Sequence, residues 1–238
     1  MEKVIVLTTA YNCAEWLERC LTSIQLQSYK DFVCYITDDL STDGTCEIAQ
    51  KFTESDERFI LVRNTVKHYQ AGNYDQILRN PSHHKESIVV EVDGDDWLPH
   101  SEVFNRVVEE HKKGHWITQG SFKYSDGRSG FAKPFSVKYL RDNPHLNATH
   151  LRTWRVKLWR AIQADDLKIN GEYASLAGDV FFMIPMLEMA GDNRIKFMEE
   201  ILYVYNESNP INEHKVDMRK QWEFARKGRN KKSYKKLK

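Results

Sequence analysis

Four carboxylates crowd one short stretch of the chain, where the apolar run IVVEV passes into DGDDWLP (residues 88–99). The side chains of Glu91, Asp93, Asp95 and Asp96 repel one another, so water or a cation must offset their charge. Carboxylate oxygens suit Mn²⁺ or Mg²⁺, which proteins usually bind through one or two carboxylates and substrate phosphates. A solvated loop with a capping aspartate is the alternative. An EF-hand is excluded, because the glycine and distal glutamate that it needs are missing.

A second acidic cluster, YITDDLSTDGT (residues 35–45), follows another apolar run. A carboxylate at this place can accept a hydrogen bond from a nucleobase N–H, such as N3–H of uracil, and Asp39 is the candidate for that role. Asp43, Gly44 and Thr45 are residue types that form turns and helix caps. We therefore expect them to be structural.

Short β-branched runs alternate with helical patterns over the first 115 residues. This alternation predicts an α/β fold with a mostly parallel sheet and helices on both faces. Ligands of such sheets bind beyond the carboxyl ends of the strands, where both acidic clusters lie. Two helix starts are also expected: Asn12 as a cap with Glu15 three residues later, and Pro99 as the first helical residue.

The second half of the chain is less regular. Residues 116–135 read as strands around a turn at Asp126-Gly127, residues 153–162 and 179–190 as helices, and 195–206 as one or two short strands. There is no low-complexity linker, so residues 1–225 are expected to form a single domain. Its nucleotide-binding half would be 1–115 and its acceptor-binding half 116–225.

The charge is unevenly distributed. The net charge is +1, but the tail 226–238 holds eight basic residues and no acid, which leaves −7 for the rest. Such a tail is either a disordered, solvated end or an attachment to an anionic surface such as a membrane. A nucleic-acid partner is not expected, because the body is acidic and carries no binding motif.

The composition also limits where in the cell the protein is expected to be found. Hydrophobic residues make up 41% of the chain, which is too many for disorder. There is no apolar run of about 18 residues, and the apolar stretch near the start is too short for a signal peptide. These features favour a cytoplasmic protein, peripheral at a membrane if the tail binds lipid. None of the four cysteines forms a C-x-x-C pair, so reduced, buried thiols are expected.

Three stretches together resemble glycosyltransferase family 2, which has the GT-A fold. They are VLTTAYNCAEWLERCLTSIQLQSYKDF (6–32), YITDDLSTDGT (35–45) and VEVDGDDWLP (90–99), with the last as a D-x-D-D element. LAGDVFFMI (176–184) adds a likeness to the spore-coat polysaccharide transferase type. The resemblance implies a metal-dependent, inverting transfer of a sugar from a nucleoside diphosphate donor, UDP-linked by preference. The acceptor would be a hydroxyl on a glycan, glycoprotein or lipid-linked molecule.

The resemblance also implies roles for individual residues. Thr9 and Tyr11 would line the nucleotide pocket, and Asp39 would bind the base. Asp179 would be the general base that takes the proton of the acceptor hydroxyl, although an aspartate at a helix start is also a common cap.

The metal ligands are less determined. Asp93 or Asp95 would touch the ribose or the metal, and Asp95 or Asp96 would be the main ligand of Mn²⁺ or Mg²⁺. His150 could line the sugar or diphosphate or simply pack, and His214 could be a late metal ligand or an exposed loop residue.

The chain departs from the family pattern in three places. It has TTA where the family usually has a proline after the first strand, and its acceptor-site pair is Gly178-Asp179 instead of Glu-Asp. The usual basic stretch is unclear in KHYQAGNYDQILRN, which leaves Lys67 or His68 as the cation facing the diphosphate. Two other functions stay open: a non-catalytic sugar-nucleotide or glycan-binding module, and a Mg²⁺-dependent phosphotransfer protein of flavodoxin-like architecture.

Overall fold

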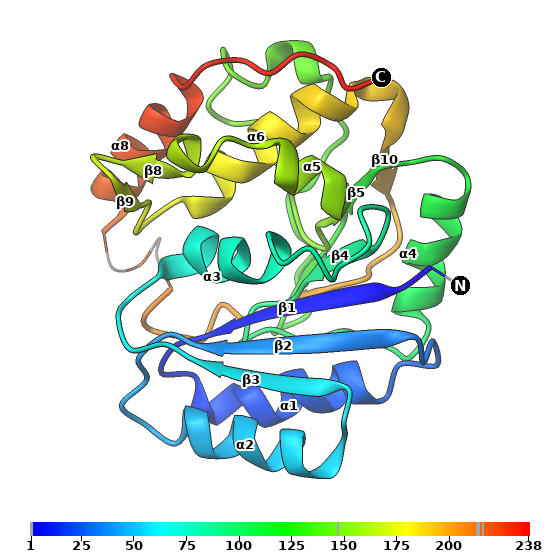
Figure 1. Cartoon of the computed structure of the whole chain (residues 1–238), viewed down its shortest axis with the longest axis vertical. Helices are drawn as coiled ribbons and strands as arrows, with labels where there is room; N and C mark the ends of the chain where they lie inside the picture. The colour runs from blue at the N-terminus through cyan, green and yellow to red at the C-terminus, as the bar shows by residue number, and fades with distance from the viewer. Residues whose placement is uncertain (1, 147, 213–214, 216) are drawn as a thin grey trace.

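A seven-stranded sheet forms the centre of the computed structural model, which describes residues 2–146, 148–212, 215 and 217–238. The strand order is β10-β5-β7-β4-β1-β2-β3 (Figure 1). All neighbours in this sheet are parallel except β7, which runs antiparallel to both β4 and β5. The strands are β1 Val4–Ala10, β2 Phe32–Asp38, β3 Phe59–Arg63, β4 Ile88–Glu91, β5 Ile117–Gly120, β7 Thr153–Arg155 and β10 Ile195–Met198. The expected α/β class with a mostly parallel sheet is confirmed.

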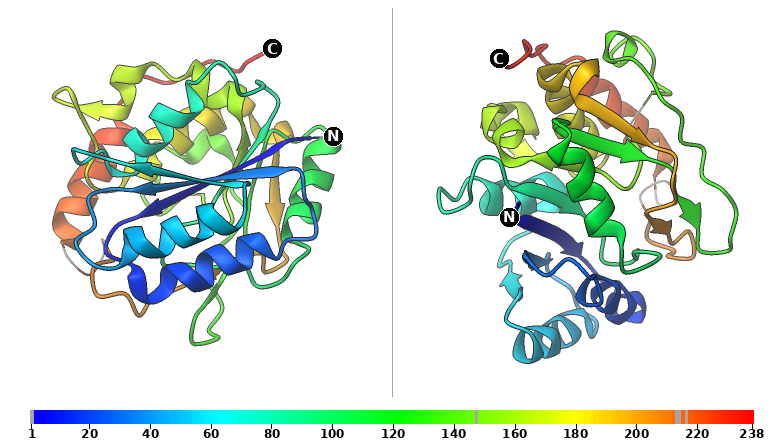
Figure 2. Two further views of the ribbon diagram at one scale, coloured as in Figure 1. Left: turned by 60° about the horizontal axis from the view of Figure 1, so that its bottom comes forward. Right: turned by 90° about the vertical axis from the view of Figure 1, so that its right-hand side faces the viewer.

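Helices cover both faces of this sheet (Figures 1 and 2). They are α1 Ala14–Gln25, α2 Thr45–Ser55, α3 Tyr69–Leu78, α4 Val103–Lys112, α5 Val156–Ala161, α6 Gly178–Ala190 and α8 Met218–Arg229. Strand β1 shows why two layers are needed, because successive side chains of a strand point to opposite faces. Val4 and Val6 pack in the core with α1 and α4, whereas Ile5 and Leu7 pack with α3, α5 and α6.

The second half adds short elements around this sheet. Strands β6 (Lys123–Tyr124) and β11 (Val204–Tyr205) pair in parallel, and β8 (Lys168–Ile169) and β9 (Glu172–Tyr173) pair antiparallel. Single 3₁₀ turns span Val137–Tyr139, Ala164–Leu167 and Asp192–Arg194. The four cysteines are buried and free of disulfides, as expected. Within the described residues, no helix has the length and apolar content to cross a bilayer.

The expected capping box at Asn12 is wrong. Helix α1 begins at Ala14, and Asn12 has a φ of 46° with its side-chain oxygen accepting a hydrogen bond from the backbone N–H of Thr42. Two backbone N–H groups at the start of α1 are hydrogen-bonded by side chains of a neighbouring loop. Asp43 accepts from Ala14 N at 3.1 Å, and Thr45 accepts from Cys13 N at 2.9 Å. The structural roles expected for Asp43 and Thr45 are therefore correct, and they extend to α1 as well, since Asp43 also accepts from the backbone N–H of Thr45 at the start of α2 at 2.9 Å.

Two other element boundaries are wrong. Residues 99–102 form bends and turns, so the helix expected at Pro99 begins only at Val103. Residues 153–155 are not helical but form β7, which fills the space between β4 and β5. The backbone of β7 forms hydrogen bonds with two strands that are far away in sequence. The stabilisation from this pairing outweighs the local helical pattern.

The basic tail is not a disordered end. Residues up to Arg229 belong to α8, and the following segment crosses the molecule next to α6 (Figure 1). Tyr234 and Leu237 pack into the core on that side, and the N–H of Leu237 donates to the carbonyl of Met189 at 2.9 Å. The guanidinium of Arg141 donates to three backbone carbonyls of residues 229, 231 and 232. Apolar packing and these bonds offset the cost of ordering a lysine-rich segment.

Candidate functional site

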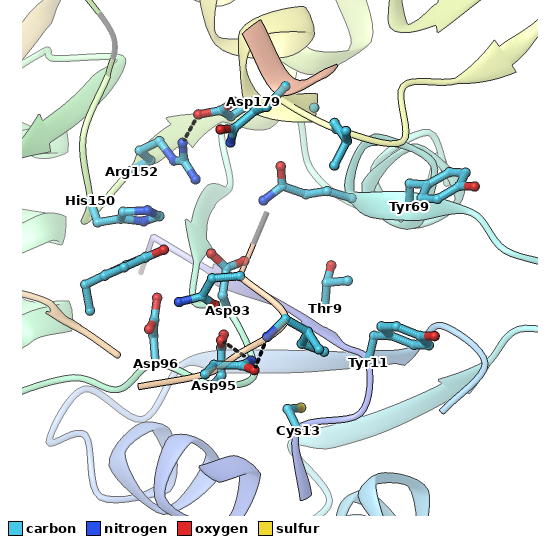
Figure 3. A pocket seen from close by; sticks show the side chains of 18 of the residues that line it. Thr9, Tyr11, Cys13, Tyr69, Asp93, Asp95, Asp96, His150, Arg152 and Asp179 are labelled. Atoms are coloured by element: carbon cyan, nitrogen blue, oxygen red, sulfur yellow. Dashed lines mark hydrogen bonds and ion pairs between the residues drawn. The ribbon is translucent and has the colours of Figure 1, made fainter. Parts of the chain in front are cut away.

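A cavity of about 820 Å³ opens at the carboxyl ends of β1, β2 and β4. Its walls include all of the expected site residues that the structure describes: Thr9, Tyr11, Asp39, Asp93, Asp95, Asp96, His150 and Asp179. Asp93 and Asp95 lie on one side and Asp179 on the other (Figure 3). His214 lies outside the described residues. The position agrees with the general rule that open α/β sheets bind ligands beyond the carboxyl ends of their strands.

The close approach of two strand ends places the acidic turn. The backbone N–H of Gly94 donates to the carbonyl of Thr9 at 3.0 Å. A Cβ atom at position 94 would lie 3.0 Å from that carbonyl and 3.0 Å from the sulfur of Cys13, so a glycine is needed here. This contact sets Asp93 and Asp95 beside the end of β1 and directs the D-x-D turn into the cavity.

The side chain of Asp96 is buried and hydrogen-bonded within the protein. Its carboxylate accepts from the hydroxyl of Tyr203 at 2.7 Å and from the backbone N–H of Asn206 at 2.6 Å, and the residue is only 1% exposed. Burial, reinforced by the charges of Asp95 and Asp93, raises the pKa of Asp96 well above its usual range. Asp96 therefore anchors the segment around β11.

Asp95 is less completely enclosed in hydrogen bonds. It accepts from the side-chain amide of Asn209 at 2.7 Å, and burial raises the pKa of its carboxyl. Among the described residues, no three His, Cys, Asp or Glu side chains are arranged to hold a metal ion by themselves. Asp93 and Asp95 both line the cavity, and two carboxylates are within the small number that Mg²⁺ or Mn²⁺ takes beside substrate phosphates.

Asp39 organises the loop that follows β3. Its buried carboxylate accepts from the backbone N–H groups of His68 and Tyr69 at 2.8 and 2.9 Å and from the side chain of Asn64 at 2.7 Å. Lys67 donates to the carbonyl of Asp39 at 2.8 Å, and its ammonium lies over the ring of Tyr11. Burial lowers the pKa of Lys67. The site expected for a base is therefore occupied by the protein's own donors.

Asp179 is not the cap of α6. The cap position is Ala177, with a φ of 51°, and Asp179 lies in the first turn. One of its oxygens accepts from the guanidinium of Arg152 at 2.7 Å (Figure 3). The same guanidinium makes a bidentate pair with Glu91, at 2.8 and 2.7 Å.

Arg152 is the functional residue that the sequence reasoning missed. It is 4% exposed, and Glu91 is fully buried. Burial opposes the charge of Arg152, but the carboxylates of Glu91 and Asp179 outweigh that effect and raise its pKa above the ordinary value. One signal was present: an acid inside the buried run IVVEV needs a positive partner. The sequence could not say which basic residue supplies it.

Gln70 completes this network from α3. Its amide donates to Glu91 at 2.8 Å. A Cβ atom on Gly178 would lie 3.3 Å from the amide oxygen of Gln70. Gly178, which replaces the acid of the usual Glu-Asp pair, therefore leaves room for the glutamine that orients Glu91.

His150 is enclosed by aromatic rings. Its imidazole stacks on Tyr203 with ring centres 4.5 Å apart, and its buried Nδ1 finds no hydrogen-bond partner among the residues that the structure describes. Burial, with a smaller effect of the Arg152 charge, lowers the pKa of His150 well below its usual value. A neutral ring cannot balance a diphosphate, so the geometry favours packing or a hydrogen bond to a sugar.

We expect this burial to make stability depend on pH. Below pH ~6.5 the unfolded chain binds a proton at His150 that the folded chain excludes, so stability is lost as pH falls through that value. The cost is about 1.4 kcal/mol per pH unit for such a group. In urea unfolding at about pH 7 and about pH 5.5, His150→Gln should lose less stability than the parent chain. The exposed His84→Gln should match the parent, and an equal loss in His150→Gln would contradict the assignment.

Aromatic side chains line part of the cavity wall. Phe122, Tyr124, Phe131 and Tyr205 all face the cavity, and Phe122 makes edge contacts with the other three rings. Phe131 is 69% exposed. Such a large exposed ring provides a flat apolar surface on which a sugar ring could pack.

Comparison with known proteins identifies the family. Residues 5–167 match the model of Glycosyl transferase family 2. The Escherichia coli protein described as UDP-Glc:alpha-D-GlcNAc-diphosphoundecaprenol beta-1,3-glucosyltransferase WfaP is 30% identical over 107 residues, covering 45% of this chain and 41% of WfaP. The first three curated relatives are matched over 15%, 33% and 61% of their own lengths. The chain thus spans less than two thirds of the relatives that it matches.

Solved structures agree on the fold. S. aureus TarS 1-349 in complex with UDP-GlcNAc has a TM-score of 0.67 at 18% identity, covering 93% of this chain and 64% of that chain. The mannosyltransferase PcManGT from Pyrobaculum calidifontis, in complex with GDP-Man and Mn²⁺, has a TM-score of 0.58 at 17% identity, covering 85% and 56%. The expected GT-A fold is confirmed. With the family model matching more than half of its length, the chain belongs to glycosyltransferase family 2.

Proposed function

We propose that the chain is an inverting glycosyltransferase that moves a sugar from a nucleoside diphosphate, UDP by preference, to an acceptor hydroxyl. The observation that carries the proposal is the arrangement across one cavity, with Asp93 and Asp95 on one wall and Asp179 on the opposite wall. UDP is favoured because TarS was solved with UDP-GlcNAc and WfaP is named for UDP-Glc.

The electrostatics of the cavity support a divalent cation. Among its described wall residues, only Lys67 and Arg152 are cations, and both already contact carboxylates. The acids of the wall are Asp39, Asp93, Asp95, Asp96, Asp179 and Glu207. A diphosphate would add negative charge to this surplus. Asp93 and Asp95 would hold Mn²⁺ or Mg²⁺, which would stabilise the charge that develops on the leaving diphosphate.

Asp179 supplies the proton acceptor. An alcohol is a weak nucleophile, so a positioned carboxylate must take its proton as the new bond forms. Arg152 fixes the direction of the Asp179 carboxylate, and Glu91 in turn fixes Arg152. With one base and no protein nucleophile in the scheme, a single displacement inverts the anomeric centre. The aromatic wall would hold the acceptor, a glycan, a glycoprotein or a lipid-linked sugar such as the one for which WfaP is named.

Thermal unfolding with UDP, GDP, dTDP and CDP tests the donor site. We expect UDP with Mn²⁺ to stabilise the fold by about 2.7 kcal/mol at a hundredfold excess over Kd, and UDP with chelator to do much less. Asp95→Asn should remove the metal-dependent part, whereas the exposed Asp142→Asn should keep it. No shift with any nucleotide would refute the donor site. A metal-dependent shift without sugar transfer would instead support the non-catalytic binding module.

A further inference from the structure

The C-terminal part of this chain carries a concentrated excess of positive charge. Residues 215–238 contain eleven basic and two acidic side chains, which leaves the rest of the chain at −8. We call the exposed side chains of α8 and of residues 230–238 the basic surface. Because the tail is bound to the body, these charges sit on a fixed surface.

Helix α8 has a buried and an exposed face. Phe224 and Ala225 pack against Ala177, Val180 and Ile184, and a Cβ atom on Gly228 would lie 2.9 Å from the side chain of Val180. Arg219, Lys220, Arg226 and Lys227 are exposed on the other side. The acid of that side, Glu223, pairs with Lys227 at 2.8 Å. The outer face therefore keeps a positive excess.

Apolar side chains stand among these cations. Trp222 is 46% exposed and Met218 is 57% exposed. Trp222 meets the ring of His145 at 6.0 Å between ring centres, so part of the indole is held in place while the rest faces solvent. Basic side chains attract anionic lipid headgroups, and tryptophan rings are enriched at the level of those headgroups.

The segment after α8 extends this pattern. Tyr234 and Leu237 turn inward and pack on the core, whereas Lys232, Lys235 and Lys238 are exposed. The inward packing of Tyr234 and Leu237 thus leaves these lysines on the surface. Each lysine or arginine close to an anionic membrane adds to the electrostatic attraction.

We propose that the basic surface binds an anionic lipid bilayer, with Trp222 entering the headgroup region. A soluble polyanion would match the charge but would leave Trp222 and Met218 without an apolar partner. The proposal does not depend on sugar transfer. It has a geometric consequence, because Gln221 of α8 lines the cavity. A bilayer against α8 lies beside the cavity that holds Asp179.

Co-sedimentation of the full chain with lipid vesicles tests the charge component. We expect binding to vesicles of phosphatidylglycerol and phosphatidylcholine in about equal parts, weakening as salt rises, and little binding to pure phosphatidylcholine. Arg219→Glu with Arg226→Glu should weaken binding at least about tenfold. The matched control, Lys51→Glu with Lys112→Glu, makes the same change of charge on exposed residues of α2 and α4 and should bind as the parent does.

The indole is tested separately. Trp222→Ser keeps every charge, so it should weaken vesicle binding several-fold and leave binding to heparin, a soluble polyanion, unchanged. The proposal is overturned if the variant with Arg219→Glu and Arg226→Glu binds vesicles as tightly as the control variant. It is also overturned if Trp222→Ser weakens neither interaction, since the surface is then a general anion binder. Urea unfolding of each variant establishes that it folds, and the UDP shift with Mn²⁺ reports the donor site independently.

Discussion

Replacing Asp179 with asparagine is expected to lower kcat by about a thousandfold, because asparagine cannot take the proton of the acceptor hydroxyl. The amide oxygen can still accept the hydrogen bond from Arg152, so the local structure should persist. Donor binding should change little, since Asp179 lies across the cavity from Asp93 and Asp95. The measurement is the rate of sugar transfer, with the UDP-dependent thermal shift as the check on donor binding.

The matched control is Asp165→Asn, which makes the same change at an exposed aspartate outside the cavity. It should keep the parent rate. A folded Asp179→Asn variant with near-parental kcat would remove Asp179 from the mechanism while leaving the nucleotide site intact.

Replacing Arg152 with methionine is expected to lower the free energy of unfolding by about 3 kcal/mol. The fully buried carboxylate of Glu91 would lose a bidentate, charged partner and keep the neutral amide of Gln70. Transfer should fall as well, because Asp179 loses the guanidinium that directs it. Urea unfolding at about pH 7 gives the stability, and the rate of sugar hydrolysis or transfer gives the activity.

A second variant distinguishes two causes of the expected loss of stability: a buried charge without a partner, and the loss of side-chain packing. Glu91→Gln combined with Arg152→Met leaves neither of these two buried positions charged, so the double variant should be more stable than Arg152→Met alone. Arg128→Met, which breaks an exposed pair with Asp126, should change stability little. If the double variant were less stable than Arg152→Met, the uncompensated carboxylate would not be the cause of the loss.

Much of the fold could be predicted from the sequence because the patterns that indicate strands and helices are local and repeated. Apolar runs such as IVVEV show a buried strand, and the acids that follow each run fall at one edge of a parallel sheet. For that reason Thr9, Asp39, Asp93 and Asp95 could be placed together before the structure was known. Their clustering depends only on strand direction.

The parts that could not be anticipated depend on contacts between distant residues. Arg152 meets Glu91 across 61 positions of the chain, and no local pattern distinguishes it from other arginines. Residues 153–155 read as helical but complete a gap between two strands. The many lysines of the tail made a solvated segment one reading of the sequence. In the structure, Tyr234 and Leu237 pack inward and hold the tail on α6.

The close approach of Gly178 to Gln70 has a consequence for how homologous chains diverge. A larger residue at 178 would press on the amide that orients Glu91, since even a Cβ atom would lie 3.3 Å from it. Positions 70 and 178 should therefore covary: a glutamate at 178 should accompany a smaller or shorter residue at 70. Introducing a glutamate at 178 while keeping Gln70 should therefore shift the Gln70 amide from its place beside Glu91.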